Sequence, residues 1–192
     1  MTQLEIMGAN AKNASVFLRT AGSKKDDALL AIAKALREHS DEIIKANEID
    51  IENGKKAGLT ESLLDRLRLT PERINGMAEG VEQVAALADP IGNVLEGRTL
   101  KNGLNIEKVR VPMGVIGIIY EARPNVTSDA AALCLMAGSA VILRGGKEAF
   151  QSSMCLTRLM REALAAEGLP ENAINLVEDT SRDTATQMMK LN

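Results

Sequence analysis

The chain contains 192 residues, of which 45% are hydrophobic, so it is long enough to bury one sizeable core. Its 23 basic and 26 acidic residues give a formal net charge of −3. That charge and a 2% aromatic content exclude any general attraction for nucleic acid or for an anionic membrane. The sequence shows neither an apolar run of membrane-spanning length nor a signal-peptide pattern at its start. We therefore expect a cytoplasmic protein without a nucleic-acid or membrane partner.

Residues 1–90 show the patterns of amphipathic helices. Hydrophobic residues recur with helical spacing between Leu29 and Leu36, and a similar stripe follows Pro71. The expected N-caps are Ser23, Thr60 and Thr70, and Ser40 is expected to start a further helix. Charged residues fall on the expected outer faces of these helices. We therefore predict a solvated helical layer that contains no functional site.

Residues 93–111 have the pattern of a β-hairpin. Asn102-Gly103 is a dipeptide typical of hairpin turns, and the run from Leu104 to Val111 alternates between apolar and polar residues with one slip at Glu107-Lys108. This mixture of side chains suits a two-stranded extension exposed to water or to a partner subunit. We expect it to mediate contact between copies of the chain, that is, a homo-oligomer.

Residues 112–192 alternate between apolar strands and helices. The predicted strands are 114–120, 140–143 and 173–177, and the first is a continuous apolar run typical of burial on both faces. Such alternation favours a parallel sheet with right-handed crossovers. The predicted fold class is α/β, a helical N-terminal layer plus a three-layer, Rossmann-like domain with a hairpin extension. Three strands make an incomplete sheet, so we expect this chain to be part of a longer protein.

Two unusual turns follow the first two of these strands. EARPN covers residues 121–125 and RGGK covers residues 144–147, and the carboxyl ends of parallel strands meet at one edge of a sheet. We therefore predict that both turns lie at the same edge, where ligands bind open α/β sheets. This placement is the strongest inference that the residues alone support.

The RGGK turn has features that suit an anion. Gly145 and Gly146 permit positive φ angles and a close approach of the backbone to a ligand, and the following helix begins with a positive end. Arg144 and Lys147 add two cations. The spacing matches neither a P-loop nor the G-x-G-x-x-G motif. A purely structural turn remains the alternative.

The EARPN turn offers other polar groups. Asn125 either caps the next helix or directs its amide toward a developing oxyanion in a ligand crevice. Arg123 pairs either with a carboxylate or phosphate of a ligand or with an acidic surface neighbour. Elsewhere, His39 is expected at a helix end, and Cys134 and Cys155 are expected to be reduced structural thiols without metal-ligand spacing.

The stretch VPMGVIGIIYEARPNVTSDAAALCLMAGSAVILRGGKEA resembles the gamma-glutamyl phosphate reductases, a branch of the aldehyde dehydrogenase superfamily. The likeness extends to AGLTESLLDRL and to the closing NLVEDTSRD. It implies reduction of L-glutamyl 5-phosphate by NADPH to glutamate 5-semialdehyde with release of phosphate, a step of proline biosynthesis. The superfamily's proline–x–glycine–valine strand corresponds to Pro112-Met113-Gly114-Val115.

The resemblance also implies roles for particular residues. Asn125 matches the oxyanion-hole asparagine of the superfamily. Either Arg144 or Lys147 takes the ribose-facing role in the nucleotide turn, and a 2′-phosphate suits both. The expected cofactor-binding residues are Tyr120, Glu121, Ala122, Arg123, Pro124, Arg144, Gly145, Gly146, Lys147 and Glu148.

The nucleophilic cysteine of the family belongs to a later domain, and neither Cys134 nor Cys155 matches its motif. We therefore expect the chain to supply the NADP-binding part of the enzyme, to contain no metal site and to be inactive alone. In domain terms, we assign 1–90 to the helical layer, 93–111 to an oligomerisation hairpin and 112–192 to βα units. The alternative is a nonenzymatic structural or interaction module.

Overall fold

The computed structural model describes residues 2–191 and confirms the α/β class. The main helices are α1 (Gln3–Leu18), α2 (Lys24–Glu38), α3 (Ser40–Lys56), α4 (Glu61–Leu67), α5 (Pro71–Ala85), α6 (Pro124–Met136), α7 (Phe150–Ala166) and α8 (Arg182–Met188). The strands are β1 (Val94–Thr99), β2 (Asn105–Val109), β3 (Val115–Ile119), β4 (Ala140–Arg144) and β5 (Ile174–Leu176), and the short 3-10 turns are η1 (Lys147–Ala149) and η2 (Glu171–Ala173).

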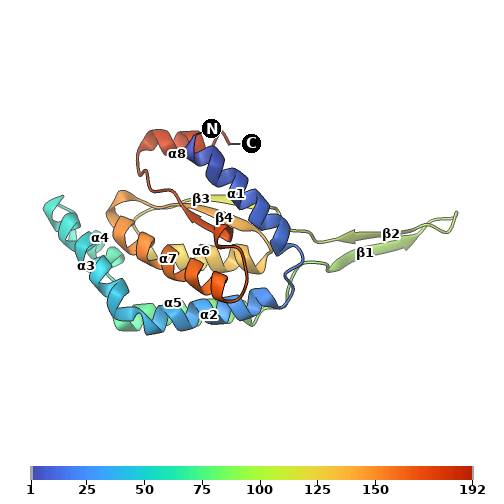
Figure 1. Ribbon diagram of the computed structural model, residues 1–192, viewed down its shortest axis with the longest axis horizontal. Helices are drawn as coiled ribbons and strands as arrows, with labels where there is room; N and C mark the ends of the chain where they lie inside the picture. Colours follow the sequence, from blue (N-terminus) through green and yellow to red (C-terminus); the bar gives the residue numbers. More distant parts are fainter. Residues whose placement is uncertain (1, 192) are drawn as a thin grey trace.

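Strands β3, β4 and β5 form one parallel sheet in the order β3-β4-β5. Helices α6 and α7 cover one face of this sheet, and α1 packs on the other face near α8 (Figure 1). Helices α2, α3 and α5 pack outside α6 and α7. The helices of the first ninety residues are therefore divided, with α1 on one side of the sheet and the others on the opposite side.

The predicted helix signals act as expected at most positions. Leu29, Ile32 and Leu36 are completely buried on the inner face of α2. The Thr70 hydroxyl accepts a hydrogen bond from the Arg73 amide at 3.2 Å and so caps α5. Ser23 also precedes its helix, but its side chain makes no capping bond.

Strands β3 and β4 differ in burial. Residues 140–143 of β4 are fully buried, as the sequence predicts. In β3, however, Gly117 is exposed and Ile119 is 45% exposed, so the prediction that this strand is buried on both faces is wrong. Strand β3 lies at one edge of the sheet, and its exposed residues alternate with half-buried ones, so one of its faces is incompletely covered.

A lysine is buried where the sequence pattern suggested only solvated charges. Lys25 on α2 is 1% exposed, and its ammonium donates to the carbonyl of Met136 at 3.0 Å and contacts the Asp89 carboxylate at 2.7 Å. Although burial raises the pKa of Asp89, the bonds from Lys25 and from the Ile91 amide together hold it below its ordinary value. The pair links α2 to the end of α6 and to the segment before the hairpin.

The predicted hairpin is confirmed. Strands β1 and β2 pair antiparallel, and Gly103 has the positive φ of 85° that the turn requires. All residues of both strands are exposed, and the hairpin projects away from the helical body (Figure 1). The irregularity in its register lies between Val94 and Glu96 rather than at Glu107-Lys108.

Candidate active site

The turns that follow β3 and β4 lie at the same edge of the sheet, as predicted. Ile119, the last residue of β3, is paired with Arg144, the last residue of β4. The Tyr120 amide continues this ladder by donating to the Arg144 carbonyl at 3.1 Å. The segment after β5 also reaches this edge, because Arg144 bonds to the carbonyls of Thr180 and Ser181.

The two glycines of the RGGK turn serve close packing rather than positive φ angles. Neither Gly145 nor Gly146 has a positive φ, so that part of the prediction is wrong. A Cβ at Gly145 would lie 3.1 Å from the Tyr120 hydroxyl oxygen, and one at Gly146 would lie 3.3 Å from the Ala122 amide nitrogen. The glycines are thus the residues that let the turn after β4 approach the turn after β3.

Tyr120 is fixed in place between α6 and α7. Its hydroxyl lies 2.7 Å from the Thr127 hydroxyl, which in turn donates to Ser153 on α7 at 3.3 Å. Burial raises the pKa of Tyr120, and the hydrogen bonds to Thr127 and Ser153 oppose this shift only in part. The phenol therefore stays neutral and presents a rigid ring edge to Gly145.

Arg144 and Lys147 differ in their environment. The Arg144 guanidinium is half-buried and held by the carbonyls of Thr180 and Ser181, the latter at 3.0 Å, while its Nε is buried without a partner. Lys147 is exposed, and within residues 2–191 its ammonium makes no hydrogen bond or ion pair. Of the two cations, Lys147 is the one free to meet a ligand.

The N-terminus of α7 is occupied by a protein carboxylate. Asp50 of α3 accepts hydrogen bonds from the amides of Gln151 and Ser152, at 3.1 and 2.8 Å, and from the Ser152 hydroxyl at 2.7 Å. The expectation that this helix end is open to a ligand anion is therefore wrong, because Asp50 takes the position of the anion. Burial raises the pKa of Asp50, against the lowering effect of its hydrogen bonds.

The EARPN turn ends in the first residues of α6. Pro124 is the first helical residue and Arg123 is the N-cap position, so Asn125 lies within the helix and does not cap it. The Asn125 amide donates to the Asp129 carboxylate at 3.1 Å. Burial raises the pKa of Asp129, and the bond from Asn125 partly offsets this. Asn125 is exposed and keeps its second N–H for another acceptor.

A pocket of about 460 Å³ lies beside Asn125, between the start of α6 and the connection from α4 to α5. It is lined by Asp65, Arg66, Arg68, Leu69, Arg73, Gly76, Met77, Arg123, Asn125 and Asp129. Its volume falls within the range typical of small-molecule sites. The pocket is thus lined by Arg123 and Asn125 of the EARPN turn and by no residue of the RGGK turn.

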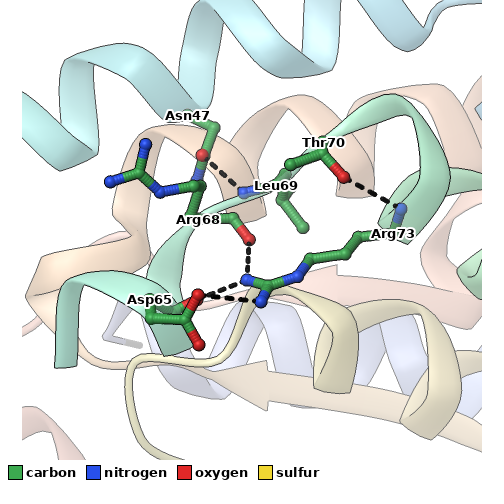
Figure 2. A network of polar contacts seen from close by, with 6 residues as sticks. All are labelled: Asn47, Asp65, Arg68, Leu69, Thr70 and Arg73. Carbon is green, nitrogen blue, oxygen red and sulfur yellow. Dashed lines mark hydrogen bonds and ion pairs between the residues drawn. The ribbon is translucent and has the colours of Figure 1, made fainter. Parts of the chain in front are cut away.

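One wall of this pocket is held by Arg73 (Figure 2). Its guanidinium donates to the Asp65 carboxylate at 2.9 Å, to the Asp65 carbonyl and to the Arg68 carbonyl at 2.8 Å. Asn47 fixes the same connection from α3, because its side chain bonds to the Leu69 amide at 2.8 Å. The Arg68 guanidinium points away from that of Arg73 (Figure 2).

We did not predict from the sequence that the N-terminal helices contribute to the pocket and to the start of α7. Asp50 and Asn47 are each 2% exposed and form a buried network with Ser152, and Arg66 and Arg73 line the pocket. Asn47 and Asp50 lie four and seven residues after the buried Ile43, so their helical spacing on the inner face of α3 was a usable signal of burial. The arginines gave no such signal, because their role depends on contact with a turn far along the chain.

The remaining candidate residues lie elsewhere. His39 is at the junction of α2 and α3, as predicted for a helix end. Cys134 is buried in α6, where burial raises its pKa to about 11, and Cys155 is half-buried in α7. Among the described residues, no group of three or more His, Cys, Asp or Glu side chains is arranged to hold a metal ion. Within the same range, no helix is long and apolar enough to cross a membrane.

The chain belongs to the aldehyde dehydrogenase family, whose model matches residues 2–192. It is 51% identical to the gamma-glutamyl phosphate reductase of Clostridium beijerinckii, with all of this chain and 47% of that protein covered. It is 58% identical to that of Clostridium novyi over 88% of this chain and 40% of that protein. The chain therefore spans less than half the length of these curated relatives.

The fold agrees with this relationship. The crystal structure of gamma-glutamyl phosphate reductase from Thermotoga maritima superposes with a TM-score of 0.96 at 39% identity, covering 98% of this chain and 46% of that chain. Membership of the family implies a nicotinamide cofactor. The sheet edge has groups suited to such a molecule, namely the free Lys147 ammonium and the half-buried Glu148 carboxylate.

Proposed function

We propose that this chain supplies the cofactor-binding part of an enzyme that reduces L-glutamyl 5-phosphate to glutamate 5-semialdehyde with release of phosphate, in proline biosynthesis. The observation that supports it most directly is the sheet edge, where a free lysine and an amide donor follow adjacent parallel strands. The names of the relatives support the same activity. NADPH is the proposed cofactor, and it supplies the hydride.

We propose that the two packed turns form the cofactor-binding site. Residues 120–122 and 144–148 contact the cofactor, and Lys147 is directed at the ribose and its 2′-phosphate. Arg144 positions the turn, because its guanidinium is already held by the carbonyls of Thr180 and Ser181. Glu148 is proposed to accept hydrogen bonds from sugar hydroxyls. Arg123 and Pro124 connect residues 120–122 to the start of α6.

Asn125 is proposed to donate its free N–H to the oxyanion that forms when a thiolate attacks the acyl phosphate. Asp129 holds the amide by accepting its other N–H. We propose that the attacking cysteine lies outside this chain. Cys134 is unsuited to the role, since its burial and raised pKa of about 11 disfavour the thiolate.

Calorimetric titration of the chain at low ionic strength tests the role of Lys147. We expect Lys147→Ala to weaken NADPH binding about tenfold, because a charge-assisted hydrogen bond to phosphate is lost. NADH binding should change little, because NADH has no 2′-phosphate. Lys101→Ala, which removes an exposed lysine near the hairpin turn, is the matched control. Equal losses of NADPH and NADH affinity would contradict recognition of the 2′-phosphate.

We propose a homo-oligomer in the cytoplasm as part of the same function, with the hairpin of residues 93–111 at the subunit contact. The support for this is its exposure, since Val94, Leu104 and Val111 are 53%, 57% and 75% exposed. A nonenzymatic interaction module is the second candidate, which the same exposed hairpin favours. It predicts no affinity for either dinucleotide and no turnover of glutamyl phosphate, even when the chain is combined with the rest of a reductase.

A further inference from the structure

The pocket beside Asn125 has an excess of positive charge that the protein itself does not neutralise. Four arginines and two aspartates line it. Arg73 is paired with Asp65, and Asp129 is bonded to Asn125. Within residues 2–191, the guanidinium groups of Arg66 and Arg123 have no hydrogen-bond or ion-pair partner. The Arg68 guanidinium also has no partner in that range, but it points away from that of Arg73 in the pocket wall (Figure 2). Arg66 and Arg123 are the two free planar cations that remain to meet a ligand in the pocket.

The two free arginines come from separate elements that are held independently. Arg66 belongs to α4, whose link to α5 is fixed by the Arg73 guanidinium and by Asn47. Arg123 is the N-cap residue of α6, followed by the buried Pro124. Two guanidinium groups that line one pocket from separate elements can each bind one anionic group of the same ligand.

We propose that Arg66 and Arg123 bind the anionic oxygen groups, carboxylate and phosphate, of the acyl phosphate that reacts at Asn125. The inference rests on the proposed function and deepens it. It moves Arg123 from the cofactor side of the turn to the substrate side, since Arg123 and Asn125 line the same pocket. Arg73 is a positioning residue, because its own guanidinium is already bonded to Asp65 and Arg68.

The test follows the arginine Nε–H signals of the isotopically labelled chain by NMR. Three probes are titrated separately: inorganic phosphate, L-glutamate, and the ketophosphonate analogue of L-glutamyl phosphate in which a methylene replaces the bridging oxygen. We expect the analogue to shift the signals of Arg66 and Arg123 and to leave that of Arg19, an exposed residue at the end of α1, unchanged. An arginine whose signal shifts with inorganic phosphate but not with L-glutamate is the one that contacts the phosphate group of the substrate.

Single substitutions provide the affinity readout. Arg66→Ala and Arg123→Ala should each weaken binding of the analogue about tenfold, and Arg19→Ala should not. Arg66 and Arg123 are exposed, so both variants should keep the native circular dichroism spectrum and thermal midpoint. Unmoved Arg66 and Arg123 signals, or unchanged affinity in both variants, would overturn the proposal.

NADPH is titrated into the same samples to separate this inference from the proposed function. If NADPH binds through Lys147 while the analogue leaves both arginines unmoved, the pocket assignment fails and the cofactor assignment stands. If the analogue binds through the arginines while NADPH does not bind, the cofactor assignment fails alone. Neither arginine substitution should alter NADPH affinity, because none of the residues proposed to hold the cofactor, 120–122 and 144–148, lines the pocket.

Discussion

Position 145 is suited to glycine because the Tyr120 side chain occupies the space where a Cβ atom would lie. The tyrosine ring cannot move freely, since its hydroxyl is bonded to Thr127 at 2.7 Å. Gly146 has a similar constraint from the backbone of residues 121–122. At the residue scale, the RGGK turn is therefore shaped by contacts within the protein itself.

Gly145→Ala should destabilise the protein by about 1–3 kcal/mol, because the new methyl group would overlap the Tyr120 ring. The Cβ would lie 3.1 Å from the hydroxyl oxygen and 3.2 Å from the ring carbon Cζ. Urea unfolding followed by circular dichroism measures the change. Gly8→Ala is the control, because Gly8 lies inside α1 and a Cβ there would have no neighbour within 4 Å, so this change should stabilise by about 0.5–1 kcal/mol. Equal stability of Gly145→Ala and the parent would refute this account.

The sequence identified the residues of the turn but not the reason for each. It showed two glycines and two cations between a strand and a helix, and these residues do lie at the sheet edge. It did not show that the glycines pack against Tyr120, or that Arg144 is held by the segment after β5. Both contacts join residues that are far apart in the chain, and a local sequence pattern carries no information about such contacts.

At the scale of elements, α3 and α7 are joined by a charged contact. The Asp50 carboxylate satisfies two of the amides that α7 leaves unpaired at its start, and it also accepts from the Ser152 hydroxyl. The 3-10 turn η1, which contains Lys147 and Glu148, directly precedes that helix start. The position of the RGGK turn thus depends on a residue of the N-terminal helices.

The raised pKa of Asp50 gives a pH dependence of known sign. Because the folded state binds the proton more tightly than the unfolded state, the contribution of Asp50 to stability is greatest below its unfolded pKa of about 3.9. That contribution is lost as the pH rises through the folded pKa, and it is constant above it. The free energy of unfolding of the parent minus that of Asp50→Asn should therefore fall with rising pH across this window.

Urea titrations of both proteins between acidic and neutral pH measure this difference. The comparison cancels the titration of the other carboxyl groups, which are common to the two proteins. Asp89 titrates in the opposite sense, since its lowered pKa adds stability above the unfolded value and loses it on acidification. A difference that rises with pH would show that hydrogen bonding, rather than burial, dominates at Asp50.

Elements were predictable where the signal was local. The stripe on α2, the Thr70-Pro71 start of α5 and the Asn102-Gly103 turn all depend on residues within a few positions of each other. The burial of β3 was not predictable, because an apolar run does not reveal whether its strand lies at the centre or at the edge of a sheet. The pocket was equally hidden, since it forms only where α4, α5 and α6 meet.

At the scale of the whole molecule, the hairpin is the part that the body does not cover. Val94 and Val109 are paired across β1 and β2 and are 53% and 40% exposed. Cross-strand partners share one face of a two-stranded sheet. This face therefore offers an apolar contact to another copy of the chain.

Sedimentation velocity over a range of concentrations tests the association. We expect the parent chain to form oligomers and the double variant Val94→Lys, Val109→Lys to shift toward monomer, because charges would be desolvated at the contact. Leu30→Lys, on the exposed face of α2, should leave the association unchanged. A parent chain that is monomeric at every concentration would exclude the hairpin as a subunit contact at this chain length.

The contact between Asp50 and α7 also sets the order in which the molecule is assembled. Asp50 and Ser152 are separated by 102 positions, so during synthesis the acid emerges long before the amides that it will bind. Until both segments are present, the carboxylate and these amides cannot satisfy each other. Docking of α3 and fixing of the RGGK turn ahead of α7 therefore depend on the same long-range contact.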